Sequence, residues 1–262
     1  MLVNTSLKER ISMLKIEKSS EMVGFAAAAM VAKQLIKKPD SVIALPTGAT
    51  PISMYETIVK FVKYGIISIE KAQLFNLDEY VGLTREDPMS FAYYMEKHLL
   101  SRIERVQHNI PATDTKDPER EASDYEEKIE KAGGFDLCLL GIGIDGHIGF
   151  NEPGTPFSSI THVAHLHPST IERNSKEFGR GRIVPDIAIT VGIKTIMKSR
   201  HIVLMATGVE KSSILKESLF GEITSDVPAS VLQLHPNLTI LVDKECAAKV
   251  ISNASEFHRM NL

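Results

Sequence analysis

Residues 41–77, SVIALPTGATPISMYETIVKFVKYGIISIEKAQLFNL, decide the expected fold of this chain of 262 residues. The stretch begins with a strand-like apolar run at 41–45 and continues through a PTGAT loop into a helix from about Pro51 to Lys63. It ends in a second strand-like run at 73–77. A strand, a helix and another strand in succession are typical of a parallel sheet covered by helices.

The same alternation extends on both sides of this stretch. Upstream, a helix over about 20–38 follows capping serines and ends at Pro39. Downstream, a loop at 78–88 leads to a helix over about 89–105. The other expected elements are a first strand at 13–17, a charged helix that ends at 131, strands at 135–140, 186–192, 201–206 and 238–242, a helix at 209–220 and a last helix from 244. We therefore predict one α/β domain over residues 1–262, a three-layer α/β/α sandwich around a mostly parallel sheet.

One segment between the later strands has weak periodicity. THVAHLH at 161–167 alternates like a short strand, and STIERNSKEFGRGR at 169–182 is polar and basic with two glycines. A mobile lid over an active site, at about 160–183, has this kind of composition. An ordinary surface excursion is an equally good interpretation of the pattern.

Composition places the chain among ordinary globular proteins. Hydrophobic residues make up 43% and charged residues 24% of the sequence, and the net charge of −3 predicts no binding to nucleic acid or to a membrane. A phosphorylated small molecule remains compatible, because an anion needs only local positive charge. Cys138 and Cys246 are isolated thiols, and we expect both to be buried and reduced. Without a long apolar run or a signal peptide, the expected location is the cytoplasm.

Four segments rich in polar residues or glycine each follow an expected strand. They cover residues 46–51, 76–82, 143–154 and 207–211. If the strands are parallel, all four meet at one edge of the sheet, where open α/β folds bind ligands. This convergence is stronger evidence for a site than any one motif.

Two of these segments predict an anion site. Thr47, Gly48 and Ala49 lead directly into a helix, so that backbone N–H groups and the positive helix end face outward. The turn after 206 opens the helix that carries Lys211 in its first turn. Each loop alone is equally compatible with an ordinary capped turn, but together they favour a bound phosphate.

The other two segments carry candidates for acid-base catalysis. Asp78 and Glu79 stand where the chain leaves the buried sheet, and a partly desolvated carboxylate there suits a general base. Considered alone, such a pair would more often face solvent. His147 lies in a glycine-rich loop with Asp145 and Glu152, either of which can orient its ring as a proton shuttle.

Two further patterns do not support a cofactor or a metal. Residues 141–146 match G-x-G-x-x-G, but no long helix and no ribose-binding acid follow, so we expect no dinucleotide site. His162, His165 and His167 have metal-like spacing, yet His162 points to the opposite face of an alternating strand from the other two. We therefore predict no metal and no organic cofactor.

Four motifs carry a resemblance to a known family: LPTGATP (45–51), NLDEYVGL (76–83), GIGIDGHIGFNEP (141–153) and LQLHP (232–236). In this order, over nearly the whole chain, they resemble glucosamine-6-phosphate deaminases. The resemblance implies a Rossmann-like fold and conversion of glucosamine 6-phosphate and water to fructose 6-phosphate and ammonia, a hydrolase and isomerase reaction of amino-sugar catabolism. That reaction needs neither a metal nor an organic cofactor.

The resemblance also implies roles for individual residues. Asp78 matches the base that moves the C2 proton to C1, and His147 matches the ring-opening acid and base, held by Asp145 and Glu152. The loop at Thr47, Gly48 and Ala49, together with Lys211, matches the substrate phosphate site.

The sequence departs from the family pattern in two places. Many members carry an arginine as a phosphate clamp where this chain has Lys176, so either Lys176 contacts the phosphate more weakly or Arg173 or Arg180 replaces it. Allosterically activated members hold an effector phosphate at positions that align with Thr155, His162 and Ala164. Because the basic pair is missing there, we predict no activation by N-acetylglucosamine 6-phosphate.

Two alternatives remain open. Galactosamine 6-phosphate is a possible substrate, because nothing in the sequence selects one C4 epimer. A sugar-phosphate sensor would keep the anion loops without the catalytic residues, although no helix-turn-helix is visible in the short N-terminal extension. We expect a homo-oligomer, although no pattern in the sequence fixes the number of subunits.

Overall fold

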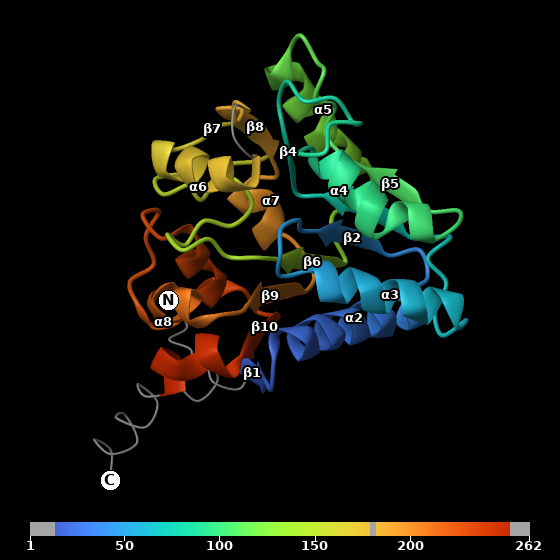
Figure 1. The fold of residues 1–262 in the computed structure, drawn as a ribbon, viewed down its shortest axis with the longest axis horizontal. Helices are drawn as coiled ribbons and strands as arrows, with labels where there is room; N and C mark the ends of the chain where they lie inside the picture. Colours follow the sequence, from blue (N-terminus) through green and yellow to red (C-terminus); the bar gives the residue numbers. More distant parts are fainter. Residues whose placement is uncertain (1–13, 179–181, 252–262) are drawn as a thin grey trace.

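The central element of the fold is a parallel sheet of seven strands in the order β1-β10-β9-β6-β2-β3-β5 (Figure 1). The structure is a computed structural model that describes residues 14–178 and 182–251, with the backbone alone for residues 176 and 177. The strands of this sheet are β1 (Leu14–Glu17), β2 (Val42–Leu45), β3 (Gln73–Asn76), β5 (Gln107–Asn109), β6 (Leu137–Leu140), β9 (Ile202–Ala206) and β10 (Leu238–Asp243). The predicted α/β sandwich with a mostly parallel sheet is therefore confirmed.

Helices cover both faces of this sheet. One face packs against α2 (Ser20–Lys37), α3 (Ile52–Lys63) and α4 (Phe91–His98). The other face packs against α5 (Pro118–Lys131), α7 (Ile193–Met197), α8 (Ser212–Phe220) and the helical residues 244–251. Because both faces are covered, β2 and β6 are buried at every position, which explains their uninterrupted apolar sequences. Within the described part of the chain, no helix is both long and apolar enough to cross a membrane.

A second sheet of three strands branches off the first. It consists of β4 (Asp78–Tyr80), β8 (Ile187–Thr190) and β7 (His162–His165), in that order and all antiparallel. Only Leu77 separates β3 from β4, and its backbone forms a hydrogen bond toward each sheet. Its N–H donates to the carbonyl of Leu45, at the end of β2, and its carbonyl accepts from the N–H of Val191, which follows β8. Asp78 therefore lies at the junction of the two sheets.

The second sheet corrects two expectations, and it includes part of the segment expected as a lid, whose role as a lid stays a prediction. Residues 78–80, expected in a loop, form β4, and the strand expected at 186–192 lies outside the parallel sheet as β8. The expected lid is a regular unit: β7 is followed by the helix α6 (Pro168–Phe178), which lies beside β7 and β8 in Figure 1. Pairing between strands that are over 100 residues apart leaves no periodic signal in the sequence, so local patterns could not reveal this sheet.

Smaller differences concern element ends. The helix expected over 89–105 ends at His98 and continues only as a 3-10 turn, Leu100–Arg102. The start of the helix expected at 209–220 is the 3-10 turn Val209–Lys211, and LQLHP overlaps a third 3-10 helix, Pro228–Leu234. We did not predict the short elements β5 and α7. Of the strand expected at 13–17, Met13 lies outside the described residues.

Candidate active site

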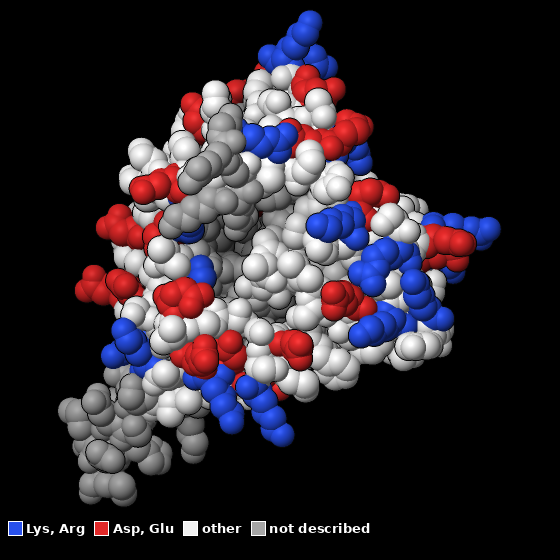
Figure 2. All heavy atoms as spheres, in the orientation of Figure 1, with Lys and Arg blue, Asp and Glu red and all other residues white. Residues whose placement is uncertain are grey.

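A cavity of about 630 Å³ opens at the carboxyl ends of β2, β3, β6 and β9. Figure 2 shows it as a hollow near the centre of the molecular face. As predicted, all four polar segments contribute to its lining. Their contributions are residues 46–50, then Leu77, Asp78 and Tyr80, then Gly143, His147, Gly149 and Phe150, and finally Thr207, Glu210 and Lys211.

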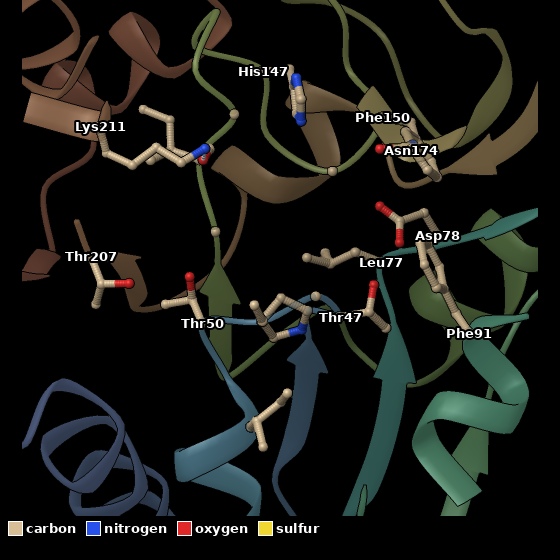
Figure 3. Close-up of a pocket in the computed structure, with 18 of the residues that line it drawn as sticks. Thr47, Thr50, Leu77, Asp78, Phe91, His147, Phe150, Asn174, Thr207 and Lys211 are labelled. Atoms are coloured by element: carbon tan, nitrogen blue, oxygen red, sulfur yellow. Dashed lines mark hydrogen bonds between the residues drawn. The ribbon is translucent and has the colours of Figure 1, made fainter. Parts of the chain in front are cut away.

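One end of the cavity is rich in groups that can bind an anion. In Figure 3, Thr50, Thr207 and Lys211 lie on the side of the cavity away from Asp78, whereas Thr47 lies next to Asp78. The backbone N–H groups of residues 47–50 donate no hydrogen bond to any residue that the structure describes. These donors therefore remain available to a ligand at the beginning of α3.

Lys211 contributes a positive charge at this end. Its ammonium group donates a hydrogen bond of 2.8 Å to the carbonyl of Ile142. Burial lowers the pKa of Lys211, and the nearby charge of Arg173 lowers it further. A bound anion would counteract both effects, because it favours the charged form of the lysine.

Asp78 stands at the opposite side of the cavity (Figure 3). Its side chain is only 6% exposed. Burial, and to a lesser extent the charge of Glu79, raise the pKa of Asp78 to about 8. A carboxyl group whose pKa is near neutrality and that faces a cavity is suited to accept and return a proton.

Glu79 has a different environment from its neighbour. Its carboxylate accepts hydrogen bonds from the backbone N–H groups of Tyr80, Phe91 and Ala92, at 2.7–2.9 Å, and so caps the beginning of α4. Burial raises the pKa of Glu79 to about 7, and these three hydrogen bonds limit the rise. Of the two acids that the sequence proposed, only Asp78 lines the cavity, and neither faces solvent.

His147 borders the same cavity as Asp78, above the anion-binding end in Figure 3. Its Nδ1 lies 2.6 Å from Oδ1 of Asp145, at an angle that makes the pair a charge contact rather than a regular hydrogen bond. Burial acts to raise the pKa of Asp145, but the contact with His147 and its charge outweigh burial and lower the pKa below its ordinary value. Asp145 is therefore ionised, and its negative charge lies beside the ring of His147.

Glu152 completes this group from the buried side. One ligand atom of each of Asp145, His147 and Glu152 lies within 4.8 Å of the others. Glu152 is 8% exposed, and no described residue forms a hydrogen bond with its carboxyl oxygens. These three residues were not expected to be metal ligands, although their carboxylate and imidazole groups are close enough together to hold a cation. The histidines that it considered are not grouped in this way in the described structure, and the expectation of a metal-free site stays a prediction.

The helix α6, in the segment expected as a lid, forms part of the cavity wall. Thr170, Arg173 and Asn174 line the cavity, and Asn174 donates a hydrogen bond of 2.7 Å to the hydroxyl of Tyr80. Nη2 of Arg173 lies 3.8 Å from Oδ2 of Asp145. The structure thus brings Arg173 into the site, while the side chain of Lys176 and all of Arg180 lie outside the described residues.

Aromatic side chains form the wall next to Asp78. Phe91 and Phe150 are stacked with ring centroids 5.8 Å apart, and Tyr80 packs against both and against Phe178 of α6. Tyr80, Phe91, Phe150 and Asn174 line the cavity but were not among the expected site residues. Tyr80 and Phe150 lie inside the motifs at 76–83 and 141–153, and Asn174 follows Arg173 directly, so their place in the sequence was the available signal; Phe91 had no such signal.

A smaller hollow of about 170 Å³ adjoins the site on the far side of Glu152. Thr155, His162 and Ala164, the positions that align with effector-binding residues of the resembled family, all line it. No lysine or arginine is among its lining residues in the described part of the chain. The predicted lack of activation by a sugar phosphate stays a prediction.

Comparison with known proteins identifies relatives over most of the chain. A curated glucosamine-6-phosphate deaminase of Clostridium botulinum strain Hall is 49% identical over 226 residues, which cover 86% of this chain and 93% of the relative. A curated glucosamine-6-phosphate deaminase of Thermoanaerobacter pseudethanolicus is 45% identical over 86% of this chain and 89% of its own length.

Solved structures share the fold. A monomeric glucosamine-6-phosphate deaminase superposes with a TM-score of 0.86 at 38% identity, and the match covers 90% of this chain and 99% of that one. A 6-phosphogluconolactonase from Trypanosoma cruzi matches 90% of this chain and 96% of its own with a TM-score of 0.73, at 20% identity. Residues 17–241 match the family described as glucosamine-6-phosphate isomerases and 6-phosphogluconolactonases. The chain belongs to this family.

Proposed function

We propose that the protein is a glucosamine-6-phosphate deaminase that converts glucosamine 6-phosphate and water to fructose 6-phosphate and ammonia. The observation that carries this proposal is that the carboxyl group of Asp78 and the ring of His147 border one cavity whose other end offers anion-binding groups. Relatives named for this activity, at 45–49% identity, support it. The lactonase structures, at about 20% identity, support only the fold.

The phosphate of the substrate binds at the end of the cavity formed by Thr47, Gly48, Ala49 and Lys211. The loop supplies unpaired backbone N–H groups, and Lys211 supplies charge. Arg173 enters the same cavity from α6 and is the arginine that this proposal assigns to the phosphate. Lys176 remains a further candidate on the same lid segment.

Ring opening is the first step, and His147 performs it. The imidazole takes the proton of the C1 hydroxyl and returns it to the ring oxygen while the bond from C1 to that oxygen breaks. Asp145 contributes because its negative charge stabilises the imidazolium that exists between the two transfers. Glu152, buried beside them, adds negative charge on the same side.

Proton transfer between C2 and C1 is the second step, and Asp78 performs it. Its carboxylate takes the proton from C2 and delivers it to C1, while one proton of the C2 ammonium group of the substrate passes to O1. The C1 aldehyde thereby becomes a hydroxymethyl group, and the C2 ammonium group becomes a protonated imine. Water then adds to C2 and ammonia leaves, which yields the ketose. The ammonium group of the bound substrate lies next to this carboxyl group and favours its ionised form.

Shielding from bulk water accompanies these steps. The stacked rings of Phe91 and Phe150 stand next to Asp78, and α6 lines the cavity beside them through Asn174, Arg173 and Thr170. An apolar wall of this kind excludes water from the intermediate of the proton transfer. Because Asp78 and His147 supply both proton transfers, the proposed reaction needs neither a metal nor an organic cofactor.

Ammonia release measured with wild type and Asp78→Asn tests the proposal. Wild type is expected to release ammonia from glucosamine 6-phosphate, and the variant, which lacks the base, to lose about 10²-fold or more of kcat. Galactosamine 6-phosphate in parallel reports the preferred epimer. A folded wild type that releases no ammonia from either sugar would refute the enzymatic proposal and return us to a sugar-phosphate sensor.

A further inference from the structure

Two tyrosine hydroxyls donate hydrogen bonds to the anion-binding loop at residues 46–50. Tyr55 of α3 donates a hydrogen bond of 2.5 Å to the carbonyl of Pro46, and Tyr94 of α4 donates one of 2.7 Å to the carbonyl of Gly48. The two rings contact each other edge to face, with centroids 6.1 Å apart. Neither tyrosine lines the cavity, so both act on the loop from outside it.

The loop has little else to hold it at Gly48. Gly48 and Ala49 are exposed, Gly48 has a φ of +96°, and no atom lies within 4 Å of the position that a Cβ would occupy on Gly48. A glycine in this conformation has more backbone freedom than any other residue. A hydrogen bond to its carbonyl therefore has a larger effect on the loop than it would in a packed segment.

Tyr94 is itself fixed relative to Asp78. The beginning of α4 is capped by the carboxylate of Glu79, the residue after Asp78, through the N–H groups of Phe91 and Ala92. Tyr94 follows within the same turn of helix and also contacts His98, with ring centroids 4.5 Å apart. A short and rigid path therefore connects the strand of the base with the carbonyl of Gly48.

We propose that Tyr94 is a positioning residue, whose hydroxyl holds the carbonyl of Gly48 away from the cavity and so keeps the N–H groups of the loop aimed at the substrate phosphate. This inference rests on the proposed function only for the identity of the substrate. Burial raises the pKa of Tyr94, so its hydroxyl is protonated and can donate this hydrogen bond at neutral pH.

The substitution Tyr94→Phe tests this role, because it keeps the ring contacts and removes only the donor. Loss of one neutral hydrogen bond that preorganises a loop is expected to raise KM for glucosamine 6-phosphate about three- to tenfold, with kcat unchanged within about twofold. The inhibition constant of inorganic phosphate is expected to rise by the same factor. Tyr93→Phe, the same change at the exposed neighbouring position, is the matched control and should alter neither constant.

Other outcomes overturn the proposal. An unchanged KM, a fall in kcat alone, or an equal change in Tyr93→Phe would show that the hydroxyl of Tyr94 does not position the loop. Calorimetric titration with inorganic phosphate separates this inference from the proposed reaction. If wild type is inactive but binds phosphate, weaker binding by Tyr94→Phe still supports the positioning role, and equal binding refutes it. A wild type that binds no phosphate also refutes it.

Discussion

Oδ1 of Asp145 lies 2.6 Å from Nδ1 of His147. Both groups are largely withdrawn from solvent, with side chains 25% and 16% exposed, so their charges are screened less than those of a surface pair. The contact lowers the pKa of Asp145 and keeps it ionised, and it leaves the other ring nitrogen of His147 for the substrate. In the proposed ring opening, His147 therefore transfers the proton while the neighbouring carboxylate of Asp145 stays ionised throughout.

Asp145→Asn should impair ring opening while leaving substrate binding intact. The amide has nearly the same shape but no charge to stabilise a protonated His147, so kcat is expected to fall about 10²-fold. Steady-state ammonia release measures the effect. Asp40→Asn, the same change at an exposed position, should retain full activity. Activity within twofold of wild type in Asp145→Asn would exclude this role.

The raised pKa of Asp78 predicts the pH dependence of catalysis. A base must be ionised, and a carboxyl group with a pKa of about 8 gains its ionised form as pH rises through that value, so kcat/KM should rise with pH there. Glu79→Gln removes a neighbouring negative charge that helps to raise this pKa, so the rise should move to lower pH. If kcat/KM does not rise with pH near this value, or if Glu79→Gln does not shift the rise, Asp78 is not the base.

The same pKa predicts how stability changes with pH. In the unfolded chain Asp78 ionises near the ordinary value of 3.8, whereas in the folded protein it ionises near 8. Between these values the folded state binds more protons, so the free energy of unfolding falls as pH rises through this window. Asp78→Asn lacks this contribution. In urea denaturation, the free energy of unfolding of Asp78→Asn minus that of wild type should increase from pH 5 to pH 8. A difference that is constant over this range would argue against a buried, titrating Asp78.

Gly143 is required for the position of His147. A Cβ on residue 143 would lie 2.2 Å from Cε1 of His147 and 2.6 Å from Oδ1 of Asp145. Gly143→Ala must therefore displace the ring, and a shift of about 1 Å is expected to lower kcat on the order of 10²-fold. Gly141→Ala adds the same methyl group where no atom lies within 4 Å, and it should have little effect on kcat. Equal kcat values for the two variants would disprove this steric argument.

Arg173 should contribute to phosphate binding. Arg173→Ala removes a charged donor from the cavity, so KM for the sugar phosphate is expected to rise about tenfold or more, and Arg173→Lys should give an intermediate value because it loses the planar fork. Arg120→Ala, which removes a charge from an exposed surface ion pair, serves as the control. If KM is unchanged in Arg173→Ala, the phosphate contact belongs to another residue of the lid segment, such as Lys176.

Much of the fold could be predicted because it depends on local patterns. The apolar runs at 42–45 and 137–140 are buried at every position, and the glycine-rich loops after them begin where the strands end. Parallel strands present these loops at one edge, so the predicted meeting of Asp78, His147 and the loop at Gly48 followed from topology alone.

Other features depend on pairing between distant segments. Asp78 and Glu79 are adjacent and chemically similar, and only the pairing of β4 with β8 and the capping of α4 give one the cavity and the other three backbone donors. That the side chain of Arg173 lines the cavity could be seen only once α6 was placed against it.

By itself, then, the sequence determined most strands and helices, though not β4, β5 and α7, and the loops that carry the reactive groups, because these depend on the period of apolar residues and on where glycine and proline interrupt it. Only the tertiary structure decided the environment of each group: which carboxyl group is desolvated beside the cavity, that Arg173 lines this cavity, and that two tyrosines donate hydrogen bonds to the anion-binding loop. The physical reason is that burial and hydrogen bonding are set by neighbours in space, and most of the neighbours that matter here are remote in the chain.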